Sequence, residues 1–440
     1  MKHRGVLATS CAAILLTSCA LANTRTHIDR QAKILKTDTL PVCLSSESNQ
    51  ISTDTLRLNP IPSKIKCGAD QIELLTSHLK GKRIALLVNQ TSISGNQKEH
   101  LLDVLLSEGI RIDKIFTPEH GFRGDADAGQ KVGNSIDTKT KIPIVSLYGN
   151  HKKPTPSDLK GIDIVLFDMQ DVGTRFYTYI STMHYAMEAC AENKVKMIIA
   201  DRPNPNDYID GPVRENDCKS FVGVDPIPIL HGMTVGELAL MINGEKWLKN
   251  GIQCDLTIIP IIGWKHGQPY HIPIAPSPNL PNDTAIRLYP SICIFEATVM
   301  SVGRGTDAPF QILGYDNPAF GTYRFTPKAK KGAQNPKLKG KHCHGVDLRI
   351  PSKDLIKMGF QSPEEIKGLS LKPLIYFYNL SKQKNIQLVD RKRTFQILIG
   401  NKKLLNQIEQ GLSEEQIKET WKKDLDQFKQ KRKKYLLYKE

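Results

Sequence analysis

The chain has 440 residues, 40% of them hydrophobic, which is enough to bury a substantial core and excludes an intrinsically disordered protein. Its formal net charge is +16, and the stretch from Lys328 to the end holds 27 Lys and Arg against 12 Asp and Glu. A basic segment of this kind can bind nucleic acid, an anionic membrane or acidic envelope polymers, although most of the lysines suit a solvated surface.

The first 19 residues are typical of a secretory signal, with a basic start and a short apolar segment that ends in Leu-Thr-Ser-Cys at Cys19. This ending matches the bacterial lipobox, in which the cysteine is lipidated and becomes the mature N-terminus. The main alternative is a plain cleaved signal, because the apolar segment is too short to span a bilayer stably. We therefore expect an exported, membrane-anchored lipoprotein on the periplasmic or outer-membrane side, which has no nucleic acid as a partner.

Residues 20–65 are rich in polar residues and are expected to form a tether. Of the nine cysteines, Cys11 lies in the predicted signal and Cys19 would carry the lipid; most of the other seven are expected to be structural, and one disulfide, for instance Cys43–Cys67, stays open. From residue 66 to 300, apolar runs alternate with helical patterns. The predicted strands are 84–88, 112–116, 142–148, 163–169 and 196–201, and the predicted helices are 97–108, 178–193 and 234–243. This order predicts a Rossmann-like, doubly wound parallel sheet in an α/β fold.

Residues 301–440 have a different pattern, with turn-rich and lysine-rich sequence followed by strand and helix pieces. A charged helix is predicted over 414–438, because apolar residues recur there at helical spacing. We expect a second, smaller α+β domain that completes a cleft with the first.

The first strand is not followed by a dinucleotide-binding Gly-x-Gly-x-x-Gly motif, and no Walker A sequence occurs. A Rossmann-like topology alone does not establish nucleotide binding, so we expect no cofactor. In the predicted helix at 234–243, Thr234 and Glu237 form a capping-box pattern, which explains Glu237 better as a structural residue than as a catalytic one.

Polar side chains follow three predicted strands, and the carboxyl ends of parallel strands meet at one edge of a sheet. The clusters are Glu119, His120, Arg123 and Asp125; Asp168, Gln170, Asp171, Thr174, Arg175 and Tyr177; and Asp201, Arg202, Asn204 and Asn206. Each residue alone could serve as a helix cap or an ion-pair partner. Together they predict a single polar site.

Carboxylates beside arginines and aromatic residues are typical of glycoside hydrolysis. Glu119 is the candidate general acid, and Asp168 or Asp171 is the candidate ionised partner. Tyr177 and His231 are candidates for contact with sugar. A metal site built from His120, Asp125, Asp127, Asp201 and His231 is an alternative, but no His-Glu-x-x-His motif occurs, and a Gly-x-Ser-x-Gly serine nucleophile is also missing.

Several longer motifs occur in order along the chain. They include Thr-Pro-Glu-His-Gly-Phe-Arg-Gly (117–124), Phe-Asp-Met-Gln-Asp-Val-Gly-Thr-Arg-Phe-Tyr-Thr-Tyr (167–179), Asp-Arg-Pro-Asn-Pro (201–205), Leu-His-Gly-Met-Thr-Val-Gly-Glu-Leu-Ala (230–239), Pro-Ser-Pro-Asn-Leu-Pro (276–281) and Ser-Val-Gly-Arg-Gly-Thr-Asp-Ala-Pro-Phe (301–310). With these motifs, the chain from about residue 70 to its end resembles the exo-β-N-acetylmuramidase family NamZ, also called DUF1343.

The resemblance implies an enzyme that releases N-acetylmuramic acid from the non-reducing end of peptidoglycan fragments, without a cofactor, in a cleft between two domains. Glu119 matches the glutamate proposed as catalytic in the family. The residues expected to line the substrate pocket are His120, Arg123, Asp125, Arg175, Tyr177, Asp201, Arg202, Asn204, His231, Asn279, Glu296 and Arg304.

A planar guanidinium suits the lactyl carboxylate of N-acetylmuramic acid, and Arg123, Arg175 and Arg304 are the candidates. The chain departs from the family pattern at Ala297 and Val302, which leaves fine substrate preference open. Two other functions stay open: a non-catalytic peptidoglycan-binding lipoprotein and a metal-dependent hydrolase.

Overall fold

The structure is a computed structural model that describes residues 65–440 except 96–97, 120 and 123–134. The predicted signal, Cys19, Cys43 and the tether lie outside these residues. The described residues, from 65 to Glu440, belong to one compact unit. Among the described residues, no helix is both long and apolar enough to cross a membrane.

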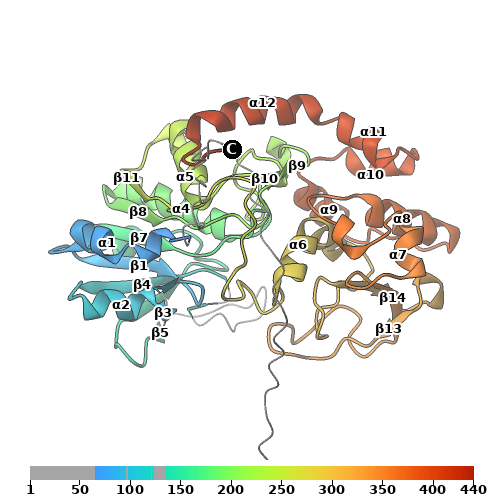
Figure 1. The fold of residues 1–440 in the computed structure, drawn as a ribbon, viewed down its shortest axis with the longest axis horizontal. Helices are drawn as coiled ribbons and strands as arrows, with labels where there is room; N and C mark the ends of the chain where they lie inside the picture. Colours follow the sequence, from blue (N-terminus) through green and yellow to red (C-terminus); the bar gives the residue numbers. More distant parts are fainter. Residues whose placement is uncertain (1–64, 96–97, 120, 123–134) are drawn as a thin grey trace, which may run out of the picture. The chain divides into compact units, whose positions relative to one another are not determined.

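A seven-stranded sheet forms the first part of the fold, in the strand order β11-β8-β7-β1-β4-β6-β5 (Figure 1). Its strands are β1 (Ile84–Val88), β4 (Ile112–Thr117), β5 (Ser135–Ile136), β6 (Pro143–Ser146), β7 (Ile164–Asp168), β8 (Lys196–Ala200) and β11 (Leu256–Ile259). All neighbours pair in parallel except β5, which runs antiparallel to β6 at the edge.

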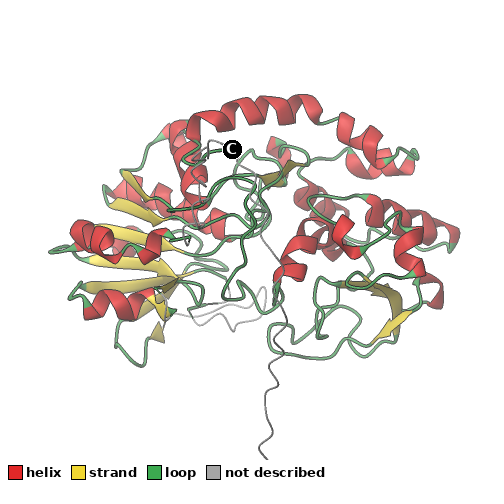
Figure 2. Cartoon of the chain, in the orientation of Figure 1, coloured by secondary structure: helices red, strands yellow, loops and turns green. Residues whose placement is uncertain are grey.

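Helices cover both faces of this sheet, as Figure 2 shows. They are α1 (Ile72–Leu79), α2 (Leu101–Ser107), α3 (Pro156–Leu159), α4 (Tyr179–Asn193) and α5 (Val235–Gly244). Successive strand residues point to opposite faces. Leu86 of β1 therefore packs in one cluster with α1 and α2, and Leu87 packs in the other with α4 and α5. The prediction of a doubly wound parallel α/β fold is confirmed.

The later part of the chain has a smaller antiparallel sheet and many helices, which confirms the predicted α+β part. Its sheet has the order β12 (Ile312–Tyr315), β14 (Cys343–Asp347), β13 (Tyr323–Phe325). Its helices are α6 (Asp283–Ile292), a 3-10 helix (Cys293–Ala297), α7 (Lys353–Lys357), α8 (Lys372–Gln383), α9 (Lys392–Ile399), α10 (Leu404–Glu409), α11 (Glu414–Glu419) and α12 (Lys422–Arg432). The domain boundary near residue 300 stays a prediction.

The prediction of one continuous helix over 414–438 is wrong. The segment is split into α11 and α12, because Trp421 at the junction has φ −110° and ψ 1°, outside the helical range. Trp421 is nevertheless buried, as its position in the apolar pattern predicts. After α12 the chain end returns to α5 (Figure 1), where the Tyr435 hydroxyl donates to Glu245 at 2.8 Å.

Candidate active site

Glu119 lies just past the carboxyl end of β4, separated from the strand by Pro118. Its side chain is half-buried, and the Thr178 hydroxyl donates a hydrogen bond to its Oε2 at 3.0 Å. Thr178 is the residue before α4, which follows β7. The segments that follow β4 and β7 therefore meet at this carboxylate, at the edge of the sheet where the parallel topology predicts a site.

Glu119 lines a cavity of about 340 Å³, within the size range of small-molecule sites. The other lining residues come from loops after the sheet strands, from α6 and its continuation, and from α9. They are Tyr148, Phe176, Tyr177, Thr178, Tyr179, Phe221, Val222, Ser277, Asn279, Leu280, Tyr289, Cys293, Glu296, Arg304, Phe310, Arg391, Thr394 and Leu398.

Aromatic rings form much of the cavity wall. The hydroxyls of Tyr177 and Tyr179 both donate to the Pro276 carbonyl, at 2.9 and 2.8 Å, and their rings pack edge to face with centroids 4.7 Å apart. Burial raises the pKa of both hydroxyls, so they stay neutral donors. The rings are therefore fixed in orientation, and apolar ring faces of this kind suit the C–H surfaces of a sugar.

Glu296 and Arg304 line the same cavity, as predicted from the sequence. Arg304 Nε donates to Glu296 Oε1 at 3.1 Å, and the guanidinium lies over the Phe310 ring, 4.8 Å from its centroid. Burial by itself would lower the pKa of Arg304, but the nearby Glu296 carboxylate outweighs it and raises the pKa above its ordinary value. The cavity thus holds a second carboxylate that is paired with a permanent cation.

Sequence reasoning missed three residues of α9 and its N-cap that line the cavity: Arg391, Thr394 and Leu398. Their spacing of three and four residues places them on one helix face, which the sequence pattern could indicate, but the pattern carries no signal that this face lines the cavity. It also missed the aromatic residues Tyr148 and Phe221, whose rings lie 6.1 Å apart.

The structure does not bring Asp168 to this cavity. Asp168 is fully buried, and Arg202 binds its two oxygens at 2.5 and 2.9 Å. Burial by itself would lower the pKa of Arg202, but Asp168 outweighs it and raises the pKa, so Arg202 keeps its charge. Both residues were predicted to belong to the site, and both instead form a buried ion pair that does not line the cavity.

Asp171, the other predicted partner carboxylate, does not line the cavity either. Its Oδ2 accepts from the Gly173 amide at 2.6 Å, which shapes the loop after β7. Burial raises the pKa of Asp171 to about 7, although the amides of Gly173 and Val172 oppose the shift. Asp171 is therefore better explained as a loop residue than as the ionised partner of Glu119.

The prediction that Arg175 binds a substrate carboxylate is wrong. Arg175 is fully buried, and its two terminal nitrogens donate to four main-chain carbonyls at 2.7–2.9 Å, those of Pro212, Ile227, Leu398 and Ile399. Burial lowers the pKa of Arg175 to about 9. A Cβ at Gly400, which has φ +88°, would lie 2.6 Å from Nη2, so glycine is needed at this close approach.

Asp201 and His231 are also structural. Asp201 accepts from the hydroxyls of Thr234 and Tyr438 at 2.7 and 2.5 Å and from the Gly236 amide at 2.8 Å, and burial raises its pKa to about 7. Burial lowers the pKa of His231 to about 4, so this imidazole is neutral. Neither side chain lines the Glu119 cavity.

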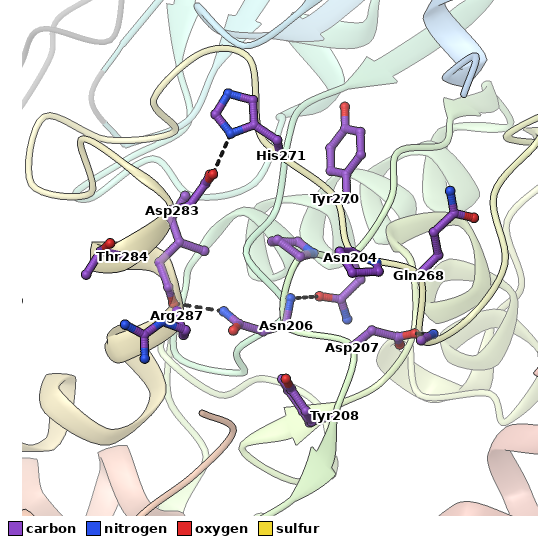
Figure 3. Close-up of a pocket in the computed structure, with 14 residues that line it drawn as sticks. Asn204, Asn206, Asp207, Tyr208, Gln268, Tyr270, His271, Asp283, Thr284 and Arg287 are labelled. Carbon is purple, nitrogen blue, oxygen red and sulfur yellow. Dashed lines mark hydrogen bonds and ion pairs between the residues drawn. The ribbon is translucent and has the colours of Figure 1, made fainter. Parts of the chain in front are cut away.

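Asn204 lines a different cavity, of about 410 Å³, which Figure 3 shows. There, Asn204 Nδ2 donates to the Met233 carbonyl at 3.0 Å, and its Oδ1 accepts from the Asn206 amide. An ion pair between His271 and Asp283 lies on the same cavity (Figure 3). The third polar cluster predicted from the sequence therefore does not converge with Glu119.

Three predicted site residues, His120, Arg123 and Asp125, lie outside the described residues. The alternative metal site depended on His120, Asp125 and Asp127, which are all outside them. In the part of the chain that is described, no three His, Cys, Asp or Glu side chains are grouped as metal ligands. The six described cysteines are buried free thiols.

Comparison with known proteins connects this geometry to a family. The family models for the N-terminal and C-terminal parts of exo-β-N-acetylmuramidase NamZ match residues 84–284 and 287–438. The peptidoglycan β-N-acetylmuramidase NamZ of Bacillus subtilis is 38% identical over 402 residues, which covers 85% of this chain and 92% of that protein.

Two solved structures of DUF1343 family proteins from Bacteroides fragilis are similar. The first is 46% identical with a TM-score of 0.76 and covers 86% of this chain and 100% of its own. The second is 32% identical with a TM-score of 0.67 and covers 85% of this chain and 99% of its own. Both halves of the chain, and so both walls of the Glu119 cavity, are matched, and the chain belongs to the exo-β-N-acetylmuramidase NamZ family.

Proposed function

We propose that this protein is an exo-acting glycoside hydrolase that releases N-acetylmuramic acid from the non-reducing end of peptidoglycan fragments, with Glu119 as the general acid. The observation that carries the proposal is the position of Glu119, half-buried at the carboxyl edge of the sheet in a ligand-sized cavity with an aromatic wall. Membership of the NamZ family supports the choice of substrate.

In the proposed reaction, Glu119 donates a proton to the glycosidic oxygen as the bond to the sugar breaks. The Thr178 hydroxyl, 3.0 Å from Oε2, orients the carboxyl group. Glu296 replaces Asp168 and Asp171 as the candidate for the second carboxylate, because it lines the cavity and forms an ion pair with Arg304 there. An ionised carboxylate there can stabilise the oxocarbenium-like transition state or activate water.

The test uses a protein that begins at residue 20, with chromogenic β-N-acetylmuramide and β-N-acetylglucosaminide as substrates. The wild type is expected to release the chromophore from the muramide, and Glu119→Gln to lower kcat by about 100-fold or more, since it cannot donate an acidic proton. Glu73→Gln, an exposed change in α1, is the matched control and should retain full activity.

Three results separate the alternatives. Binding of muramyl glycans without release by the wild type would support a non-catalytic binder. Full activity of Glu119→Gln would remove Glu119 from the mechanism. Loss of activity with a chelator and recovery with a divalent ion would support the metal-dependent hydrolase.

For the N-terminus we propose cleavage before Cys19 and lipidation of its thiol, which would tether the enzyme to the membrane close to the cell wall. The lipobox-like sequence ending at Cys19 supports this. Fractionation of cells that express the full chain is expected to place it in the membrane fraction, and Cys19→Ser to lose incorporation of labelled palmitate. Equal labelling of both proteins would contradict the proposal.

A further inference from the structure

Arg304 and Arg391 line the Glu119 cavity, and they differ in how far a neighbouring carboxylate balances their charge. Arg304 donates to Glu296 at 3.1 Å and lies over Phe310, so its charge has a partner within the wall. Arg175 is fully buried and bound to main-chain carbonyls. Arg391, in contrast, lines the cavity with a side chain that is 50% exposed, and its Nε lies 3.8 Å from a carboxylate oxygen of the adjacent, 41% exposed Asp390.

Two features fix the position of Arg391: its place at the start of α9 and a hydrogen bond from its backbone amide. It is the N-cap residue of α9, and its amide donates to the Ala297 carbonyl at 3.3 Å, next to Glu296 in the sequence. Thr394 and Leu398, one and two turns further on, line the same cavity. The guanidinium is therefore held at the cavity by a helix face that packs on the segment carrying Glu296.

A second cation lies near Arg391. Lys337 Nζ donates to the main-chain carbonyls of Glu296 and Thr298. Burial lowers the pKa of Lys337, and the positive charge of Arg391 lowers it further, so the two cations are close enough to repel each other. A ligand carboxylate beside Arg391 would relieve this repulsion.

We propose that Arg391 binds the lactyl carboxylate of the muramyl sugar and so sets the preference for muramyl over glucosaminyl substrates. The proposal rests on the proposed function, because N-acetylmuramic acid differs from N-acetylglucosamine by the lactyl ether group that carries this carboxylate. A guanidinium whose N–H groups are free to donate binds a carboxylate through two parallel hydrogen bonds. Arg391 thus takes the role for which Arg123, Arg175 and Arg304 were the candidates from the sequence.

The kinetic test compares a chromogenic β-N-acetylmuramide with the same compound carrying its lactyl group as a methyl ester. Arg391→Ala is expected to lower kcat/KM for the free acid by about 10- to 100-fold, the loss of one charge-assisted contact, and for the ester by less than about 3-fold. Arg391→Lys should recover part of the loss, because it restores the charge but not the fork.

Arg393→Ala is the matched control. Arg393 is two residues further along α9, and its guanidinium donates to the Asp217 carbonyl, away from the lining residues. This variant should behave like the wild type on both substrates. An equal loss on acid and ester by Arg391→Ala, or no loss on the acid, would overturn the proposal.

A binding measurement separates this proposal from the catalytic one. Calorimetric titration of Glu119→Gln with free N-acetylmuramic acid should show binding that weakens by about 10- to 100-fold when Arg391→Ala is added, with no change for N-acetylglucosamine. If the wild type cleaves nothing but this difference remains, the catalytic function fails and the role of Arg391 stands. If both proteins bind N-acetylmuramic acid equally, Arg391 has no such role.

Discussion

Thr178 connects the helix after β7 to the proposed catalytic carboxyl group. Its hydroxyl donates to Glu119 Oε2 at 3.0 Å, and Thr178→Val puts a methyl group in the place of that hydroxyl and so removes the hydrogen bond. We expect kcat to fall by about 10-fold, with KM and stability nearly unchanged, because a bond to the acid matters for its orientation in the transition state.

The control for this variant is Thr182→Val. Thr182 lies one turn further along α4, is buried, and donates to the Thr178 carbonyl at 3.2 Å without contacting the cavity. In steady-state kinetics on the muramide, Thr182→Val should have a kcat close to that of the wild type. A fall in kcat of the same size in both variants would assign the effect to α4 and not to Glu119.

Arg175 shows how a buried guanidinium can stabilise a fold without touching a ligand. Its four hydrogen bonds join the loop after β7 to Pro212, to Ile227 and to the end of α9. Arg175→Met would remove the donor that these buried carbonyls share, and among the described residues only the Ile227 carbonyl would keep another, the Arg214 amide at 3.1 Å. We expect a loss of about 2–4 kcal/mol in the free energy of unfolding.

Urea unfolding measures the loss of stability. The ratio of activities on the free-acid and ester muramides tests whether Arg175 binds the substrate carboxylate. The folded Arg175→Met protein should keep the wild-type ratio. A lower ratio with unchanged stability would restore Arg175 as a carboxylate-binding residue and remove it from the structural account.

At the scale of elements, His266 connects its own loop to α5 and to the segment after β8. Its Nε2 lies 3.0 Å from Glu237 Oε1 at the start of α5, and its Nδ1 lies 3.0 Å from Asp207 Oδ2. Burial by itself would lower the pKa of His266, but Asp207 and Glu237 outweigh it and raise the pKa from 6.5 to about 9.

Because the pKa of His266 is raised on folding, the charged imidazole stabilises the folded state fully below pH 6.5, and this contribution is lost as the pH rises through about 9. We expect His266→Gln to be less stable than the wild type at pH 6 and the difference to shrink by pH 10, as measured by urea unfolding. His271→Gln, at an exposed ion pair with Asp283, is the control and should cost little at any pH. A difference that stays constant with pH would show that His266 acts through packing alone.

The strands and the polar residues directly after them could be predicted, because both depend on local sequence. β1 is a continuous apolar run buried on both faces, and Glu119 and Tyr177 follow strands that end at the same edge. The break before α12 could not be predicted from the sequence, because Ile417, Trp421 and Leu425 keep helical spacing across it and are all buried.

Contacts between distant segments were also beyond the sequence pattern. Arg391 reaches the cavity only because α9 packs against the segment that carries Glu296, which no local spacing specifies. The wrong prediction for Asp168 has the same cause. A carboxylate at the end of a strand looks like a site residue in the sequence, and the sequence pattern does not show that Arg202 binds and neutralises it. Residue type and strand order thus identify the edge of the sheet, and packing decides which side chains face the cavity.

At the scale of the whole molecule, the two parts of the chain share one hydrophobic core. A single cluster of buried residues extends from Ala85 in β1 to Phe428 in α12. The end of the chain also binds the first part, since the Tyr438 hydroxyl donates to the buried Asp201 at 2.5 Å and accepts from the Ile261 amide. The cavity is lined from both parts as well.

A protein of residues 66–300 alone is therefore expected to lack a cooperative unfolding transition, because it would expose the core face that the later helices cover and leave Asp201 without Tyr438. Residues 66–440 should unfold in one transition, and residues 66–432, which lack only the end of the chain, should unfold in one transition at lower urea concentration. Circular dichroism in the near ultraviolet and limited proteolysis check the three proteins together. A sharp transition for residues 66–300 would show instead that the Rossmann-like part folds independently, and that the shared core forms by docking of two finished domains.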